Sequence, residues 1–244
     1  MIFGGYLGVS LLDWPGKVST VVFTRGCNFL CHFCHNRDLV IDEGKVEKLE
    51  EDEIVRRVKK RSKLIDGVVI TGGEPTLHKG LVGFCGKIKA LELMVKLDTN
   101  GTNYIVLKEL IDKKQINCVA MDIKSDWRNY ARVVGKKGVA IKNIKKTLEL
   151  ILKSDLEYEL RTTVVPEIHK EQMLVNMAQE IIGVKRRLKI KKPVEWTWQN
   201  FRGENCLDER FNNKKGYALV KIKGMKKRIE KAGVIVGLRG WSAS

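Results

Sequence analysis

The sequence contains little proline and no long apolar run. Only 4 of its 244 residues are proline, which argues against proline-rich linkers between domains. No stretch approaches the roughly 20 consecutive apolar residues that a membrane-spanning helix requires. The first residues also lack the basic and apolar regions of a secretory signal. We therefore expect a cytoplasmic protein without membrane spans.

Acidic residues are scarce relative to basic ones. The chain has 46 Lys and Arg against 29 Asp and Glu, a formal net charge of +17, and 43% of its residues are hydrophobic. That apolar fraction excludes a disordered chain and is enough to bury a core. A basic surplus attracts acidic proteins and nucleic acids, but it also occurs on solvated surfaces that have no partner. Composition alone leaves these alternatives open.

Cysteine is unevenly distributed along the chain. Three of the six cysteines fall within eight residues, in the pattern Cys27-x3-Cys31-x2-Cys34. The remaining three stand alone and match no motif: Cys85, Cys118 and Cys206. In a cytoplasmic protein a cluster of this kind indicates a metal site before it indicates disulfides. Isolated cysteines are usually small buried apolar residues.

Two kinds of metal site are compatible with three clustered thiolates. A structural zinc ion needs a fourth ligand, which His32 or His35 offers. A four-iron cluster held by three cysteines instead leaves one iron without a protein ligand, and a catalytic metal needs such an open position. Structural zinc sites usually draw on two separated ligand pairs, so the spacing favours the iron–sulfur cluster.

Short runs rich in Val and Ile alternate with longer amphipathic segments. Strands are expected over 18–24, 68–71, 94–98, 118–123, 158–165, 194–198 and 234–238, and helices over 52–64, 81–91, 141–152, 173–181 and 216–232. This alternation predicts βαβ units and a parallel sheet, either doubly wound or barrel-like. We expect one α/β domain over 18–244, preceded by an N-terminal arm or hairpin over 1–17.

Polar and glycine-rich motifs follow the expected strands. They are Arg25-Gly26-Cys27, Thr71-Gly72-Gly73-Glu74-Pro75, Asp98-Thr99-Asn100-Gly101, Asp122-Ile123-Lys124, Arg161 with Val165-Pro166, and Gln199-Asn200-Phe201-Arg202. The carboxyl ends of parallel strands open on one face, and that face carries the active site in such folds. The six motifs therefore predict a single site.

Several residues of these motifs suit a charged organic ligand. Glycines at a strand end allow a ligand to approach the backbone, and Glu74 offers a carboxylate either to an ammonium group or to the following helical turn. Asp98 is placed to accept hydrogen bonds from sugar hydroxyls or an amine. Asp122 and Lys124 offer opposite charges to the two ends of an amino acid. Each residue alone is also compatible with a structural role.

The cysteine motif with Phe33 before its last cysteine, followed by Gly72-Gly73-Glu74-Pro75, resembles the radical S-adenosylmethionine (SAM) superfamily. Further motifs resemble the activating enzymes of glycyl-radical enzymes, above all those of anaerobic ribonucleoside-triphosphate reductase and pyruvate formate-lyase. These motifs are Ser10-x2-Asp13-x-Pro15-Gly16, Gly26-Cys27-Asn28, Cys34-His35-Asn36, Asp98-Thr99-Asn100-Gly101, Asp122-x-Lys124 and Arg161-x3-Val165-Pro166. The resemblance extends from about residue 4 to residue 202.

The resemblance implies a fold and a set of cofactor-binding residues. The implied fold is a partial (βα)6 TIM-type barrel with parallel strands, in a single domain. Cys27, Cys31 and Cys34 would hold a [4Fe–4S] cluster whose open iron binds SAM. The residues implied to surround SAM are Phe33, Cys34, His35, Gly72, Gly73, Glu74, Asp98, Asn100, Asp122, Lys124, Arg161 and Arg202. Phe33 would lie beside the adenine, 72–74 near the methionine amine, Asp98 near the ribose, and Asp122 and Lys124 beside the methionine moiety.

The resemblance also implies a reaction and partners. SAM would be cleaved reductively to methionine and a 5′-deoxyadenosyl radical, which takes a hydrogen atom from a glycine of a partner enzyme. No side chain is expected to be a catalytic acid or base, because the cluster and SAM carry the chemistry. The expected partners are an anaerobic ribonucleotide reductase or a pyruvate formate-lyase-like enzyme, and a flavodoxin or ferredoxin as electron donor. Neither a membrane nor nucleic acid is expected, and the protein should be oxygen-sensitive and come from an anaerobic setting.

The sequence departs from the family at several points. No further cysteine lies between Cys34 and Thr71, so a second cluster is not expected. Some members have a histidine after the sixth strand, where this chain has Phe201 and Arg202, so Arg202 or Arg161 is the candidate contact of the SAM carboxylate. The basic runs 185–192 and 214–231 lie outside the motifs that build the SAM site, which favours a role in docking the donor or the target enzyme.

Two alternatives remain from the sequence. The first is a radical SAM enzyme that modifies RNA, suggested by the net charge of +17. The second is a zinc-stabilised nucleic-acid-binding module without catalysis, which leaves Gly72-Gly73-Glu74-Pro75 and the other strand-end motifs unexplained.

Overall fold

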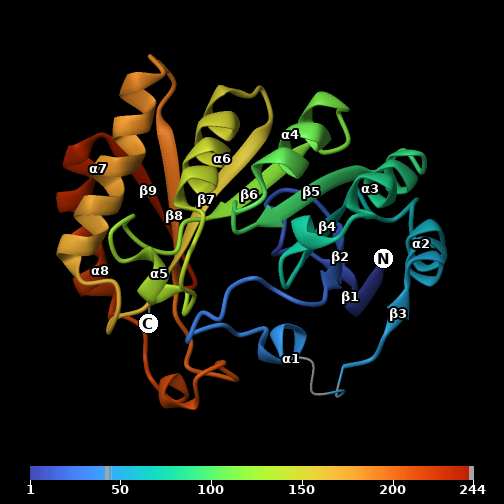
Figure 1. Ribbon diagram of the computed structural model, residues 1–244, viewed down its shortest axis with the longest axis horizontal. Helices are drawn as coiled ribbons and strands as arrows, with labels where there is room; N and C mark the ends of the chain where they lie inside the picture. Colours follow the sequence, from blue (N-terminus) through green and yellow to red (C-terminus); the bar gives the residue numbers. More distant parts are fainter. Residues whose placement is uncertain (42–43, 45, 242–244) are drawn as a thin grey trace. The chain divides into compact units, whose positions relative to one another are not determined.

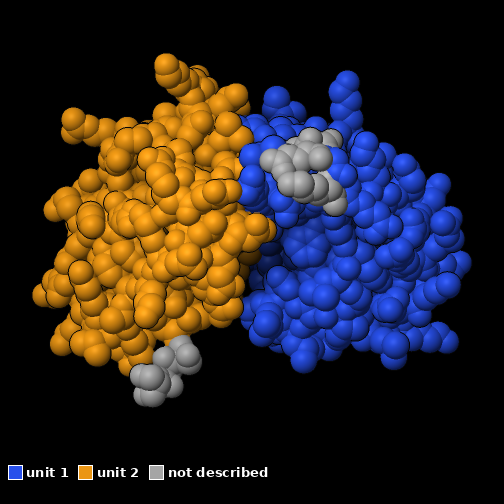
Figure 2. All heavy atoms as spheres, turned by 90° about the horizontal axis from the view of Figure 1, so that it is seen from below, with its two compact units in different colours: residues 1–28, 36–120, 156–158 blue, residues 29–35, 121–155, 159–244 orange. Residues whose placement is uncertain are grey.

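The computed structural model describes residues 1–41, 44 and 46–241, which form two compact units (Figure 2). Unit 1 comprises residues 1–28, 36–120 and 156–158, and unit 2 comprises residues 29–35, 121–155 and 159–244. Residues 42–43, 45 and 242–244 of the domain expected over 18–244 lie outside the described residues.

The sheet of unit 1 combines one antiparallel edge with parallel strands. Its strands are β1 (Ile2–Ser10), β2 (Ser19–Thr24), β3 (Leu49–Glu50), β4 (Gly67–Gly72) and β5 (Met94–Thr99), in the order β3-β1-β2-β4-β5 (Figure 1). β1 runs antiparallel to β2 and to β3, whereas β2, β4 and β5 are parallel. The carboxyl ends of β2, β4 and β5 therefore share one edge, and the loops that leave them carry the predicted motifs.

Helices and a buried tryptophan complete unit 1. The helices are α1 (Arg37–Val40), α2 (Glu51–Lys59), the 3₁₀ turn η1 (Pro75–Leu77), α3 (Leu81–Lys89) and α4 (Tyr104–Asp112). Phe3 of β1 packs on Phe84 of α3 with ring centroids 4.8 Å apart. The turn after β1 buries Trp14 against Val21 and Val69. The first 17 residues thus form a strand and a turn that belong to the core of unit 1.

Unit 2 is a parallel sheet covered by long helices. Its elements are α5 (Tyr130–Val133), α6 (Ile141–Lys153), β7 (Glu157–Val164), α7 (Glu171–Arg187), β8 (Val194–Asn200), η2 (Glu209–Phe211), α8 (Leu219–Ile229), η3 (Glu230–Ala232) and β9 (Val234–Arg239). β7, β8 and β9 are parallel neighbours, and the first two residues of β7 belong to unit 1. β6 (Cys118–Asp122) is likewise divided, because its last two residues belong to unit 2.

The strand predictions are confirmed, but three of the described helices were not predicted: α1, α4 and α5. Each of the seven predicted strands has a counterpart whose ends differ from the prediction by two residues at most. α4 is an additional nine-residue helix, begun by Asn103, whose side chain accepts a hydrogen bond from the Val106 amide. The isolated Cys85, Cys118 and Cys206 are buried, as predicted. The alternation of strands and helices, with a mostly parallel sheet, confirms the α/β class.

Candidate functional site

In unit 1 the loops after β2 and β4 are in backbone contact. The Gly73 amide donates to the Thr24 carbonyl over 2.9 Å, and the Glu74 amide donates to the Gly26 carbonyl over 2.8 Å. A Cβ atom added to Gly73 would lie 1.9 Å from the Gly26 oxygen. Because no side chain fits there, glycine at this position is required for the Gly-Gly-Glu loop to lie against the start of the cysteine loop.

The buried Glu74 carboxylate joins the loops after β4 and β5. Its Oε1 accepts from the Thr76 amide (3.1 Å), the Thr76 hydroxyl (2.5 Å) and the Thr99 hydroxyl (2.8 Å), and its Oε2 accepts from the Asn100 amide (2.6 Å). Burial raises the pKa of Glu74, and these hydrogen bonds oppose that shift. Glu74 also caps η1, so the expected role in the following turn is confirmed. Its contact with a SAM ammonium group stays a prediction.

Asp98 is paired with a buried lysine that the sequence analysis missed. Lys96 Nζ lies 2.6 Å from Asp98 Oδ1, and the Lys96 side chain is only 1% exposed. The two residues share a face of β5 because side chains two positions apart in a strand point the same way. This period of two is the signal that would have identified Lys96 from the sequence. The pairing neutralises Asp98 within unit 1.

Unit 2 contains a compact charge cluster made of Asp122, Lys124 and Arg161. Asp122 Oδ1 accepts from Arg161 Nε over 2.9 Å, and Asp122 Oδ2 accepts from Lys124 Nζ over 3.0 Å. Burial opposes ionisation of Asp122, but the two cations outweigh it and hold the pKa of the carboxyl well below its usual range. Asp122 and Lys124 are thus paired with each other, with Arg161 as a third member, and their contact with the methionine moiety of SAM stays a prediction.

The cysteines of unit 2 lie within electrostatic reach of that cluster. Burial opposes protonation of Lys124, yet the charges of Asp122, Cys31 and Cys34 raise its pKa above the usual value. A cation placed in this way favours the thiolate forms of Cys31 and Cys34, which are the forms that ligate metals. The cysteine loop is fixed to the segment after β8, because the Leu207 amide donates to the Cys34 carbonyl over 3.0 Å.

Phe33 and Lys124 are connected through a buried histidine. The His169 ring lies edge-on to the Phe33 ring, with centroids 6.1 Å apart. Nδ1 of His169 accepts from the Val165 amide at 3.0 Å, which leaves Nε2–H to donate to the Lys124 carbonyl at 2.9 Å. Sequence reasoning missed His169, because nothing in a lone histidine after Val165-Pro166 indicates which loops it joins.

His35, Phe201 and Arg202 meet at the other end of the cysteine loop. His35 Nε2 lies 2.6 Å from the Arg202 carbonyl, and the His35 ring stacks on Phe201 with centroids 5.8 Å apart. Phe201 is buried, whereas the Arg202 side chain is exposed. In unit 2 the Arg202 backbone thus contacts a predicted site residue, while the Arg161 side chain belongs to the charge cluster.

The predicted site residues fall into one group in each unit. Unit 1 holds Cys27, Gly72, Gly73, Glu74, Asp98 and Asn100, and unit 2 holds Cys31, Phe33, Cys34, His35, Asp122, Lys124, Arg161 and Arg202. Within the described residues, no three His, Cys, Asp or Glu side chains converge as ligands of one metal ion. A four-iron cluster takes each thiolate on a different iron, so its ligands need not converge on one point. None of the helices described is both long and apolar enough to cross a bilayer.

Comparison with known proteins supplies a family and several relatives. The model of the radical SAM superfamily matches residues 21–179. A Methanocaldococcus jannaschii protein named "Putative glycyl-radical enzyme activating enzyme" is 33% identical over 86% of this chain and 84% of its own length. The pyruvate formate-lyase-activating enzyme of Clostridium pasteurianum is 29% identical over 73% of this chain and 76% of its own length.

Other relatives have different activities. A Pyrococcus horikoshii protein named "Probable GTP 3′,8-cyclase" is 27% identical over 76% of this chain and 60% of its own length. Among solved structures, Streptococcus suis SuiB bound to S-adenosylmethionine superposes with a TM-score of 0.66 at 14% identity, over 90% of this chain and 50% of SuiB. The likeness to SuiB bears on the fold alone, and it agrees with the partial barrel expected from the sequence.

Proposed function

The chain belongs to the radical SAM superfamily, and from that premise we propose that it activates a glycyl-radical enzyme. Members of the superfamily use a [4Fe–4S] cluster and SAM. The observation that carries the proposal is the similarity to the M. jannaschii relative, which has 33% identity across most of both chains. The C. pasteurianum activating enzyme supports the same choice.

The residues of this chain fit the two cofactors. All six cysteines lie within the described residues and none forms a disulfide, so Cys27, Cys31 and Cys34 can serve as thiolate ligands. Lys124 supplies the neighbouring positive charge that favours thiolates at Cys31 and Cys34. We assign the cluster to these three cysteines. When bound, the cluster supplies the electron that cleaves SAM to methionine and the 5′-deoxyadenosyl radical that oxidises a partner glycine.

We assign SAM contacts to residues of each unit. In unit 2, Phe33 is held by His169 for contact with the adenine, and the Asp122–Lys124–Arg161 cluster offers charges to the methionine moiety. In unit 1, the Gly72–Glu74 loop presents backbone close to the start of the cysteine loop. The protein binds and orients the cofactors and excludes water from them. None of these side chains needs to accept or donate a proton.

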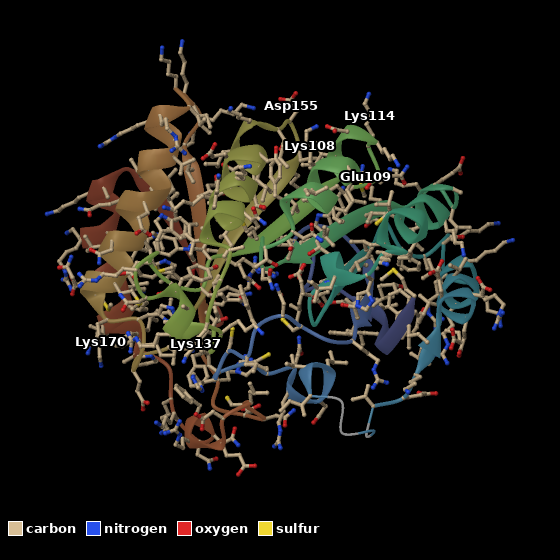
Figure 3. All side chains as sticks on the ribbon, in the orientation of Figure 1. Lys108, Glu109, Lys114, Lys137, Asp155 and Lys170 are labelled. Atoms are coloured by element: carbon tan, nitrogen blue, oxygen red, sulfur yellow. The ribbon has the colours of Figure 1, made fainter. Side chains whose placement is uncertain are left out.

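The basic charge of the chain supports docking of an acidic electron donor. Unit 2 contains 28 of the 46 Lys and Arg but only 13 of the 29 Asp and Glu. Lys137 follows α5 and Lys170 precedes α7, and both are exposed (Figure 3). α5 is fixed to the cysteine loop because the Leu30 amide donates to the Val134 carbonyl over 2.9 Å. A donor such as flavodoxin or ferredoxin, attracted by these charges, would approach the loop that carries Cys31 and Cys34.

Two measurements test the proposed function. Anaerobically reconstituted protein, reduced in the presence of SAM, should release 5′-deoxyadenosine, and Cys31→Ala should abolish both the product and the iron content. The matched control is Cys85→Ala, which removes a buried cysteine of α3 and should retain iron. With anaerobic ribonucleotide reductase or pyruvate formate-lyase added, a glycyl-radical EPR signal is expected. Absence of that signal, together with modification of added RNA, would favour the RNA-modifying alternative.

A further inference from the structure

Three polar side chains of unit 1 form a closed ring of hydrogen bonds beside Cys27. Asn100 Nδ2 donates to Asn28 Oδ1 over 2.8 Å, and Asn28 Nδ2 donates to Thr102 Oγ1 over 2.9 Å. The Thr102 hydroxyl then donates to Asn100 Oδ1 over 2.7 Å. The ring joins the loop after β5 to the residue that follows the first cysteine, so it fixes the Asn100 carboxamide relative to Cys27.

The ring also determines which end of the Asn100 carboxamide faces the sulfur. Oδ1 accepts from the Thr102 backbone amide over 3.0 Å, and a backbone N–H can only donate, so this atom is the oxygen. Nδ2 therefore faces Cys27, whose Sγ lies 3.9 Å away. One proton of Nδ2 is directed to Asn28 and the second is available to the sulfur. The Asn100 backbone is anchored as well, through its amide and Glu74 Oε2.

Burial increases the effect that this contact has on the sulfur. Asn100 is only 5% exposed, so little water competes with its N–H group, and a hydrogen bond is electrostatically stronger in such surroundings. Hydrogen bonds to the sulfur ligands of an iron–sulfur cluster are among the factors that determine its reduction potential. A donor withdraws negative charge from the thiolate and stabilises the more negative, reduced cluster.

We propose that the Asn100 carboxamide donates a hydrogen bond to the Cys27 thiolate and thereby raises the reduction potential of the cluster. Asn100 acts through Cys27, so it is a positioning residue and not a catalytic one. Asn28 and Thr102 maintain its orientation. The inference rests on the proposed ligation of the cluster by Cys27, and iron content tests that ligation separately from the hydrogen bond.

The decisive experiment is an EPR-monitored redox titration of reconstituted Asn100→Ser. Serine is too short to reach the sulfur, so the cluster should become harder to reduce. At the potential where half of the wild-type cluster is reduced, the reduced-to-oxidised ratio of the variant should fall about threefold to tenfold. Asn103→Ser is the matched control, because Asn103 lies in the same loop as Asn100 but its carboxamide donates to the Thr76 carbonyl of η1, and serine can still cap α4. Its cluster should titrate like that of the wild type.

A second variant keeps the test independent of the first. Asn100→Asp preserves Oδ1 for Thr102 but replaces the donor facing Cys27 with an acceptor, so it should lower the potential further than Asn100→Ser. Full iron content with an unchanged potential in either variant would overturn the proposal. If neither variant binds iron, the wild type tests the hydrogen bond directly, by pulsed EPR of protein whose asparagine side chains carry ¹⁵N. A ¹⁵N coupling to the reduced cluster is expected, and its absence refutes the hydrogen bond. Loss of iron in Cys27→Ala would confirm the ligation whatever the potentials show.

Discussion

Arg161 Nε donates to Asp122 Oδ1 over 2.9 Å, although the two residues are 39 positions apart. The second oxygen of the same carboxylate accepts from Lys124. One half-buried acid therefore pairs with two cations, and the group carries a net positive charge. Removing Arg161 would leave Asp122 paired with Lys124 alone and would remove one of the two charge-assisted hydrogen bonds that its carboxylate accepts.

Arg161→Met should lower the free energy of unfolding by about 2 kcal/mol, less than a fully buried pair would lose, because Lys124 remains. The measurement is urea unfolding at neutral pH. Arg228→Met is the matched control, since Arg228 forms an exposed ion pair with Glu171 and the loss of this pair should lower the free energy of unfolding much less. Equal losses in the two variants would contradict the role assigned to Arg161 in the charge cluster.

His169 should make the stability of the protein fall in mild acid. Burial lowers the pKa of His169 from 6.5 to about 4, so the unfolded chain binds a proton below pH 6.5 that the folded chain does not bind. The stability that neutral, buried His169 contributes is therefore fully present above pH 6.5 and is lost as the pH falls towards 4. Below pH 4 the free energy of unfolding no longer changes because of His169. The loss over this range should be on the order of 3 kcal/mol.

His169→Gln removes this titration. The free energy of unfolding of the variant should vary less between pH 6.5 and 4 than that of the wild type, even if the variant is less stable throughout. Unfolding midpoints measured at several pH values provide the comparison. Parallel curves for wild type and variant would show that His169 does not titrate as its burial implies.

Much of the fold was predictable because strands and helices differ in the period of their apolar residues. The run around Val68 is apolar and β-branched, as strands covered on both faces are, whereas the run from Val194 alternates buried and more exposed residues, and both lie in the sheet. α4 escaped prediction because its start depends on a side-chain cap from Asn103, which a search for long amphipathic stripes does not detect.

The site was predictable in its residue types and less so in its contacts. The motif identifies Glu74 as a site residue. The hydrogen bonds that Thr76, Thr99 and Asn100 donate to its carboxylate depend on which loops meet at the strand ends. His169 was not predictable, because its role arises from contacts with Phe33 and Lys124, which are distant in the sequence. Patterns along a chain report local periodicity, and such long-range contacts have none.

Gly73→Ala should disrupt the start of the cysteine loop. The added Cβ would lie 1.9 Å from the Gly26 oxygen. Since the Cβ is fixed to the Gly73 backbone and the oxygen belongs to the Gly26 backbone, one of the two loops has to move. We expect a loss of at least about 3 kcal/mol in the free energy of unfolding, or failure to bind iron. Gly83→Ala is the control, because nothing lies within 4 Å of its Cβ position in α3, and it should gain about 0.5–1 kcal/mol. Normal stability and iron content in Gly73→Ala would contradict the close approach.

Reduction by an acidic protein donor should depend on salt and on the charges of unit 2. Four exposed lysines labelled in Figure 3 allow a matched comparison. Lys137 and Lys170 belong to unit 2 and Lys108 and Lys114 to unit 1. Since unit 2 contains 28 of the 46 basic residues, its field should steer the donor and that of unit 1 should contribute little.

The double variant Lys137→Glu/Lys170→Glu should be reduced by flavodoxin about threefold to tenfold more slowly at low ionic strength, with the difference shrinking as salt is added. Lys108→Glu/Lys114→Glu changes the net charge by the same amount and should be reduced at nearly the wild-type rate. Stopped-flow absorbance of the cluster gives the rates, and reduction by photoreduced deazaflavin controls for changes in the cluster itself. Equal slowing of both variants would mean that net charge, and not a docking surface on unit 2, governs the encounter. Since the two variants change the net charge equally but on different units, the comparison separates a surface that receives a partner from one that is merely solvated.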